Sequence, residues 1–230
     1  MGLRELNVEA RRQRILDAAR RLITAGGMAA LSMRKLASEA GLSVTTLYNL
    51  FGVREEILQA LVLDAIDQMD LILERDAPLD DPIERCRAVI TVSVRHMAEN
   101  EAIFRPMVIA AQQASSAGGG SSGEVTRRAV RMQALAIRAA IDQGMLTDLL
   151  DPVQLGQQIY HGFELASIQW ALGLRDEAQF EARALYGLGV ALLGVASEAI
   201  RPELEAELQK LENQLKARPQ QRTRRSRKRS

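Results

Sequence analysis

Short polar side chains dominate residues 43–49, and their types and spacing are suited to recognition chemistry. In a helix that starts near Val44, Leu47 and Leu50 occupy inward positions and the polar groups face outward. Hydroxyl, phenol and carboxamide groups on such a helix can reach phosphates or base edges in the major groove of DNA. The outward set comprises Ser43, Thr45, Thr46, Tyr48 and Asn49.

The elements that must position this helix form a predicted helix-turn-helix. Ser32 is predicted to begin a short helix and Gly41 to end it. Gly41 suits the turn because two short helices that cross steeply need a residue that tolerates left-handed backbone. Upstream, an amphipathic helix is predicted from Asn7 as N-cap to Gly26-Gly27. An ordinary helical hairpin is the alternative interpretation, and the upstream helix and local positive charge favour DNA binding.

Helical periodicity continues through the rest of the chain. Asp81-Pro82 and Asp151-Pro152 each supply an N-cap followed by proline at the first helical position. Further helices are predicted after Gly52, near 102–113, near 124–143, from about 176 to 200 and from Pro202, with a flexible loop over 115–123. The sequence has no strand alternation, so we expect an all-α fold of about ten helices.

Charge is segregated along the chain, although the formal net charge is only +1. Residues 1–56 carry nine basic and six acidic side chains, a net of +3. Residues 57–217 carry 14 basic and 23 acidic side chains, a net of −9, and residues 218–230 carry seven basic side chains and no acidic ones. This asymmetry indicates basic surfaces at both ends and an acidic middle that stays off DNA.

Several classes of site are disfavoured by composition. Cys86 is the single cysteine, and His96 and His161 are the only histidines, so we expect no intrachain disulfide, metal site or Ser-His-Asp triad. We therefore expect no enzyme activity and no cofactor. The N-terminus lacks an apolar signal segment, and the longest apolar uncharged run, residues 184–197, is short for a membrane span. A soluble cytoplasmic protein without a membrane partner is expected.

Residues 11–58 resemble the DNA-binding domain of the TetR family of bacterial transcriptional regulators. Three runs carry the resemblance: Ile15-Leu16-x-Ala18-Ala19, Leu36-Ala37-x-x-Ala40-Gly41-Leu42-Ser43 and Leu47-Tyr48-x-x-Phe51. The resemblance implies an N-terminal three-helix DNA-binding domain and a C-terminal helical domain for ligand binding and dimerisation. The implied DNA-binding residues are Ser32, Arg34, Lys35, Ser43, Thr45, Thr46, Tyr48, Asn49 and Arg54.

The resemblance also suggests roles for individual residues. The Tyr48 hydroxyl would donate to a phosphate, Thr45 and Thr46 would read bases or backbone, and Arg54 would hold phosphate at the start of the fourth helix. Three positions depart from the family pattern. Leu50 stands where His or Tyr is frequent, which favours core packing. Val53 is a poor N-cap where Ser is common, and Thr45 replaces a small residue.

The C-terminal domain is expected to bind an effector. Apolar and aromatic residues at helical spacing are candidates to line its pocket, and packing in an ordinary core is the alternative. The candidates are Met69, Met97, Phe104, Met107, Met132, Met145, Phe163 and Trp170. His161 and Arg105 are candidate polar groups that orient the ligand. The acidic surroundings disfavour anionic effectors unless an inward arginine compensates.

Two stripes of small and apolar residues suggest a homodimer interface, because small residues let helices pack closely between subunits. Packing within one chain is the alternative. The stripes are Leu155, Ile159, Gly162 and Ala166, and Gly187, Ala191 and Gly194. A two-fold dimer would double the contacts of one recognition helix and predicts a palindromic double-stranded DNA operator.

The predicted organisation has four parts. These are a helix-turn-helix domain (1–53), an effector-binding and dimerisation domain (54–200), a C-terminal helix (201–217) and a basic disordered tail (218–230). The tail is either inert or attracts DNA non-specifically. We expect a ligand-responsive transcriptional regulator, a repressor, released from its operator by a small apolar or amphipathic effector. The alternative is a constitutive or architectural DNA-binding protein without an effector.

Overall fold

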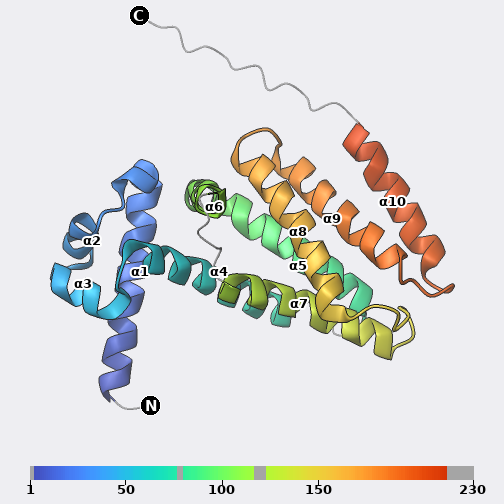
Figure 1. Ribbon diagram of the computed structural model, residues 1–230, viewed down its shortest axis with the longest axis horizontal. Helices are drawn as coiled ribbons and strands as arrows, with labels where there is room; N and C mark the ends of the chain where they lie inside the picture. Colours follow the sequence, from blue (N-terminus) through green and yellow to red (C-terminus); the bar gives the residue numbers. More distant parts are fainter. Residues whose placement is uncertain (1–2, 77–79, 117–122, 217–230) are drawn as a thin grey trace, which may run out of the picture.

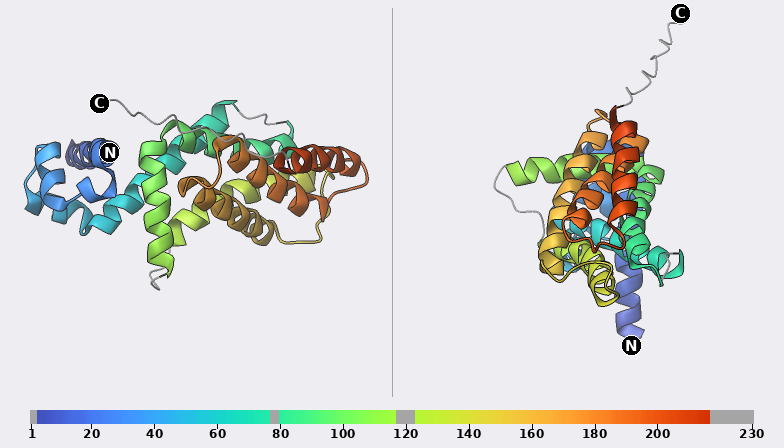
Figure 2. Two further views of the ribbon diagram at one scale, coloured as in Figure 1. Left: turned by 90° about the horizontal axis from the view of Figure 1, so that it is seen from above. Right: turned by 90° about the vertical axis from the view of Figure 1, so that its right-hand side faces the viewer.

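The computed structural model describes residues 3–76, 80–116 and 123–216, and these residues form ten α-helices. The predicted all-α fold is confirmed. The helices are α1 (Leu3–Ala30), α2 (Met33–Ala40), α3 (Val44–Phe51), α4 (Arg54–Asp76), α5 (Pro82–Glu99), α6 (Glu101–Ser116), α7 (Gly123–Asp142), α8 (Pro152–Ala171), α9 (Glu177–Leu193) and α10 (Arg201–Lys216). Helices α1–α3 lie at one end, α5 and α7–α10 form a larger bundle, and α4 joins the two (Figures 1 and 2).

Local capping chemistry builds the N-terminal unit as a helix-turn-helix. The side chain of Ser32 accepts a hydrogen bond from the backbone N–H of Lys35, and Ser43 likewise caps α3 by accepting from Thr46. Gly41 ends α2 in the left-handed region at φ 64°, where a side chain would be strained. The predicted boundaries of both short helices are therefore confirmed.

The start of α1 differs from the prediction. Asn7 was expected to cap this helix, but α1 already begins at Leu3 and Asn7 lies inside it. Good helix formers on both sides of Asn7 propagate the helix past the capping candidate. The predicted end is confirmed, because Gly26 and Gly27 both have non-helical backbone angles within the span assigned to α1.

Helix α4 belongs to both hydrophobic cores. Ile57 and Leu61, in its first half, are buried with Ile15, Leu36 and Leu47 of the N-terminal unit. Its second half buries an apolar set in the larger core, namely Ala65, Ile66, Met69 and Leu73. The predicted domain boundary after residue 53 therefore passes through the N-terminal core, because Ile57 and Leu61 belong to that core. Met107 of α6 is buried in the same core.

The larger bundle is organised around α5, α7, α8 and α9. Its most deeply buried side chains include Trp170, Phe180 and Ile137. The helix predicted to extend to residue 200 ends at Leu193. The chain then turns and forms a single antiparallel bridge between Leu146 and Ala196. Backbone hydrogen bonds of this bridge replace those of the missing helical turn, which explains the shorter helix.

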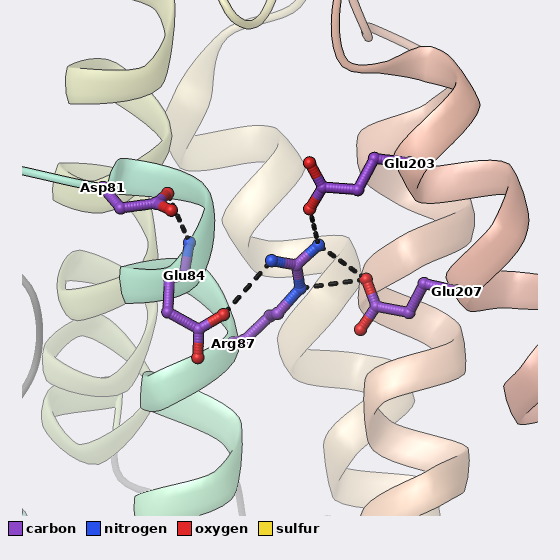
Figure 3. Close-up of polar contacts among 5 residues, drawn as sticks. All are labelled: Asp81, Glu84, Arg87, Glu203 and Glu207. Atoms are coloured by element: carbon purple, nitrogen blue, oxygen red, sulfur yellow. Dashed lines mark hydrogen bonds and ion pairs between the residues drawn. The ribbon is translucent and has the colours of Figure 1, made fainter.

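Helix α10 docks on the bundle through both apolar and ionic contacts. Leu204 and Leu211 of this helix are buried. Arg87 of α5 lies between the carboxylates of Glu84, Glu203 and Glu207 (Figure 3), and its Nη2 is 2.6 Å from Glu207 Oε2. The predicted basic tail, and most of the predicted loop, lie outside the described residues.

Candidate DNA-binding surface and interior cavity

The outer face of α3 presents three of the predicted DNA-binding residues to solvent. Thr45, Tyr48 and Asn49 are exposed, and Tyr48 retains 50% of its accessible surface. Their spacing places them on one side of the helix. Helices α2 and α3 lie at one end of the molecule, away from the larger bundle (Figure 1).

Ser43 and Thr46 have local structural roles. The Thr46 Oγ1 and Ser43 Oγ atoms are 2.8 Å apart, and the backbone N–H of Thr46 donates to Ser43 Oγ. Thr46 is also partly buried. Of the two threonines predicted to read DNA, Thr45 is therefore the more exposed.

The start of α2 adds a second exposed patch. Ser32, Arg34 and Lys35 are all exposed, so two cations lie beside the positive N-terminal end of this helix. Such an end favours anions such as phosphate. These three residues and the outer face of α3 define the candidate DNA-binding surface of this unit.

Arg54 occupies a different environment from these exposed residues. It is partly buried, and its Nη2 donates to the backbone carbonyl of Met28 at 2.8 Å. Its Nε has no hydrogen-bond partner among the described residues. The structure thus gives Arg54 an intramolecular partner, and its phosphate contact stays a prediction.

Neighbouring contacts explain two departures from the family pattern. Leu50 is partly buried against the N-terminal core, as expected for a packing residue. The backbone N–H of Val53 donates to Glu56 Oε2 at 3.0 Å, and the backbone N–H of Glu56 donates to the Val53 carbonyl, so these two residues pair at the start of α4 although the Val53 side chain cannot accept a hydrogen bond. Sequence reasoning did not identify Arg12, whose Nη1 donates to the Leu50 carbonyl and whose guanidinium lies 4.3 Å from the centroid of the Phe51 ring.

A cavity of about 730 Å³ lies between α4, α5, α6, α7 and α8. Six of the eight residues predicted to line the pocket do line it, namely Met69, Met97, Phe104, Met107, Met132 and Phe163. Trp170 does not; it stacks on Phe180, and the Arg105 guanidinium lies 4.4 Å from its ring centroid. Met145, Arg105 and His161 are also absent from the lining.

Arg105 and His161 are therefore not placed to orient a ligand in this cavity. Arg105 donates from Nη1 to the carbonyl of Trp170 and forms an ion pair with Glu101. His161 is exposed on the outside of α8. Each side chain lies on a face of its helix that does not line the cavity, and the sequence pattern alone could not predict which face that would be.

Polar side chains from α5, α7 and α8 line part of the cavity. The Ser93 and Ser167 hydroxyls donate to carbonyls of their own helices, at Val89 and Glu164. Gln133 is only 3% exposed, and neither polar atom of its carboxamide has a partner among the described residues. Sequence reasoning missed Gln133, although one polar residue on the otherwise apolar face of α7 was a detectable signal.

The cavity extends from the larger core to the junction with the DNA-binding unit. Met28, Arg54 and Gln59 belong to its lining together with the residues of the larger core. Gly156 of α8 also belongs to the lining, at a point where α7 and α8 cross closely. A Cβ at Gly156 would lie only 3.3 Å from the Val130 carbonyl oxygen. The cavity is thus bounded by a tight helix crossing and by the junction.

The predicted interface stripes divide into buried and exposed residues. Leu155, Ile159 and Ala166 are buried in the core of their own chain, so the structure contradicts an interface role for these three. They lie on the inward face of α8, where packing within the chain was the alternative. Gly162 and Gly194 are exposed, and Gly187 and Ala191 are partly buried. The exposed apolar residues of the same helices include Leu165 and Val190.

No group of three or more His, Cys, Asp or Glu residues placed to hold a metal ion occurs in the described ranges. Likewise, none of the helices described is long and apolar enough to cross a membrane. Cys86 is buried, and burial raises the pKa of its thiol to about 12, which suppresses the nucleophilic thiolate.

Comparison with known proteins matches residues 15–61 to the family of bacterial regulatory proteins described as the tetR family. The HTH-type transcriptional repressor KstR of Mycolicibacterium smegmatis is 31% identical over 146 residues, which cover 60% of this chain and 68% of that protein. The chain belongs to the TetR family. An HTH-type transcriptional regulator of Mycobacterium tuberculosis is 36% identical over 91 residues, covering 39% of this chain and 45% of that regulator.

The chain thus spans about half the length of the first curated relatives that it matches. Among solved structures, a TetR-family transcriptional regulator of Pectobacterium atrosepticum has a TM-score of 0.64 at 28% identity, covering 84% of this chain and 97% of that one. RolR in complex with resorcinol has a TM-score of 0.65 at 21% identity, covering 89% and 95%. These likenesses agree with the observed TetR fold.

Proposed function

We propose that this TetR-family chain is a ligand-responsive transcriptional repressor. It binds a palindromic DNA operator as a homodimer, and a small effector in the cavity releases it. One observation carries the proposal: the cavity that lies among Met97, Met132 and Phe163 also reaches Met28 and Arg54. The structurally similar RolR was crystallised with resorcinol, which supports a small molecule as the occupant.

The contact between α4 and the helix-turn-helix can couple the cavity to DNA binding. Arg54 begins α4 and holds the Met28 carbonyl, which precedes α2, so it joins the cavity lining to the helix-turn-helix. An occupant that favours another position of α4 would also displace α2 and α3. Such an effector shifts the population only by its difference in affinity between the two arrangements.

The homodimer is proposed from the outer faces of α8 and α9. Leu165 and Val190 are 59% and 50% exposed, and Gly162, Gly187 and Gly194 leave room for close helix approach. The structure gives no neighbour within 4 Å to a Cβ built at Gly162 or Gly187. Two such faces would form an intersubunit four-helix bundle.

A constitutive DNA-binding protein without an effector is the second candidate. It would be favoured by a filled C-terminal core, whereas the described residues line a cavity of about 730 Å³. That volume lies within the range that holds a small ligand, roughly 300–1,000 Å³. The cavity therefore supports the ligand-responsive proposal over the constitutive one.

Selection of the full chain on random double-stranded DNA tests this function. We expect a palindromic site, bound by two copies, with affinity that falls as salt rises. Elution with libraries of small apolar compounds should then release the protein from that site. Binding without sequence preference would contradict the operator, and a selected site insensitive to every compound that binds the protein would favour the constitutive candidate.

A further inference from the structure

The carboxamide of Gln133 is the least satisfied polar group in the cavity. It projects from α7, is 3% exposed, and both its Oε1 and Nε2 lack partners among the described residues. A buried polar group without a hydrogen bond costs about 1–3 kcal/mol. Replacing it with an apolar side chain would remove that cost, so its presence here points to a partner that arrives with the ligand.

The apolar surroundings of Gln133 indicate the chemical character of the rest of the ligand. Ala129 and Met132 of the same helix line the cavity with it, as do Ile159 and Phe163 of α8. The ligand therefore has an apolar body that packs on these walls. Its polar part is limited, because the Ser93 and Ser167 hydroxyl protons are already donated to helix carbonyls.

The charges around the cavity are unfavourable for an anion. Glu55, Glu56 and Glu164 belong to its lining, and Arg54 is the single cation there among the described residues. The Arg54 guanidinium already donates from Nη2 to the Met28 carbonyl, and its Nε has no partner among the described residues. A carboxylate ligand would lose its hydration beside three acidic side chains, and the one cation to offset them among the described lining residues is Arg54, whose Nη2 is already engaged.

We propose that the effector is an uncharged, apolar molecule with one group that both donates and accepts hydrogen bonds. A carboxamide, lactam or hydroxyl group fits, because it donates to Gln133 Oε1 and accepts from Nε2. A carboxylate only accepts and leaves Oε1 unpaired. This inference rests on the proposed function, since it names the chemical class of that effector.

Calorimetric titration of the full chain without DNA tests the proposal with four probes that share one alkyl chain. The probes are decanamide, 1-decanol, decanoate and decyltrimethylammonium. We expect the amide and the alcohol to bind at least about tenfold more tightly than the two ions. Gln133→Leu should lower decanamide affinity about tenfold, lower decanoate affinity by a smaller factor and raise the melting temperature of the unliganded protein.

Gln169→Leu is the matched control, because Gln169 Oε1 is also buried without a partner but lies outside the cavity lining. It should leave the affinity for every probe unchanged. Gln133→Met is a second variant that preserves the unbranched shape if the leucine variant folds poorly. The proposal is overturned if an ion binds most tightly, if neither decanamide nor decanol binds, or if the Gln133 variants bind decanamide as the parent does.

Operator release is measured separately with the same probes. Gln133-dependent binding of decanamide that leaves the operator complex intact would contradict the proposed function but support the ligand class. Release of the operator by a compound that binds equally well to the Gln133 variants would support the proposed function but contradict the ligand class. The two failures are therefore distinguishable.

Discussion

The Nη2 atom of Arg54 donates to the backbone carbonyl of Met28 at 2.8 Å, which joins the start of α4 to the segment that precedes α2. Both residues line the cavity. The family resemblance implies that Arg54 binds a DNA phosphate, whereas the structure shows it bound to the Met28 carbonyl. Experiment can separate these two roles.

We expect Arg54→Ala and Arg54→Lys to weaken operator binding several-fold alike, because neither side chain reproduces the planar guanidinium that holds the Met28 carbonyl. The slope of log affinity against log salt should stay as in the parent, since no phosphate contact is lost. Fluorescence anisotropy over a salt series measures both. A slope reduced by about one in the alanine variant and preserved in the lysine variant would instead show that Arg54 neutralises a phosphate.

Two exposed residues of α3 should affect DNA binding in different ways. Tyr48→Phe removes a hydroxyl predicted to donate to phosphate, so it should weaken specific and random duplexes by the same factor. Thr45→Ala should change the preferred bases within the site, by about 1–3 kcal/mol at the affected position. Binding selection on random DNA with each variant compares the two. An unaltered base preference for Thr45→Ala would remove Thr45 from base reading.

Substitutions on the outer faces of α8 and α9 should separate the proposed dimer into monomers. Leu165→Asp and Val190→Asp place a charge where an apolar contact between copies is proposed, and desolvating it is costly. Size-exclusion chromatography with light scattering should give half the parental mass. Leu149→Asp is the control, because Leu149 is 72% exposed outside both helices. Parental mass in all three variants would argue for another interface.

Arg87 should contribute measurably to stability. Its side chain is 15% exposed and pairs with three carboxylates, two of them on α10. Arg87→Ala should lower the free energy of unfolding by about 1–2 kcal/mol, since it leaves those carboxylates without their partner. Urea denaturation measures the change. Arg127→Ala, which removes an exposed pair with Glu124, should change it by less than about 0.5 kcal/mol.

His96 should make the protein less stable in mild acid. Burial lowers the pKa of His96 below its ordinary value, although the nearby Glu99 and Asp64 carboxylates oppose this and Arg20 reinforces it. The unfolded chain therefore binds the proton more readily, and stability falls as the pH drops below about 6.5. Melting temperatures between about pH 7.5 and 5.5 should fall less in His96→Gln. His161→Gln, which changes the other histidine, is the control; an equal effect of both substitutions would contradict the assignment to His96.

Local signals predicted the N-terminal unit well, because its determinants are close in sequence. Ser32, Gly41 and Ser43 set the limits of α2 and α3 through hydrogen bonds and backbone angles that span only a few residues. Asn7 failed as a cap because its neighbours continue the helix on both sides. A favourable capping residue does not begin a helix when the preceding residues are also helical.

The larger bundle was less predictable because periodicity does not say what covers each face. Leu155, Ile159 and Ala166 follow an interface-like spacing, yet they pack against helices of their own chain. Trp170 and Phe163 both show the expected helical spacing, but only Phe163 borders the cavity, since Phe180 and Arg105 cover the indole. Such choices depend on the packing of helices distant in sequence.

The sharing of α4 between two hydrophobic cores has a consequence for folding cooperativity. Because Ile57 and Leu61 complete the N-terminal core while Met69 and Leu73 of the same helix are buried in the larger one, melting of α4 removes contacts from both. The two units are then coupled in one unfolding transition. A fragment that stops at residue 53 would lose that shared helix and with it part of the interior that makes the DNA-binding unit rigid.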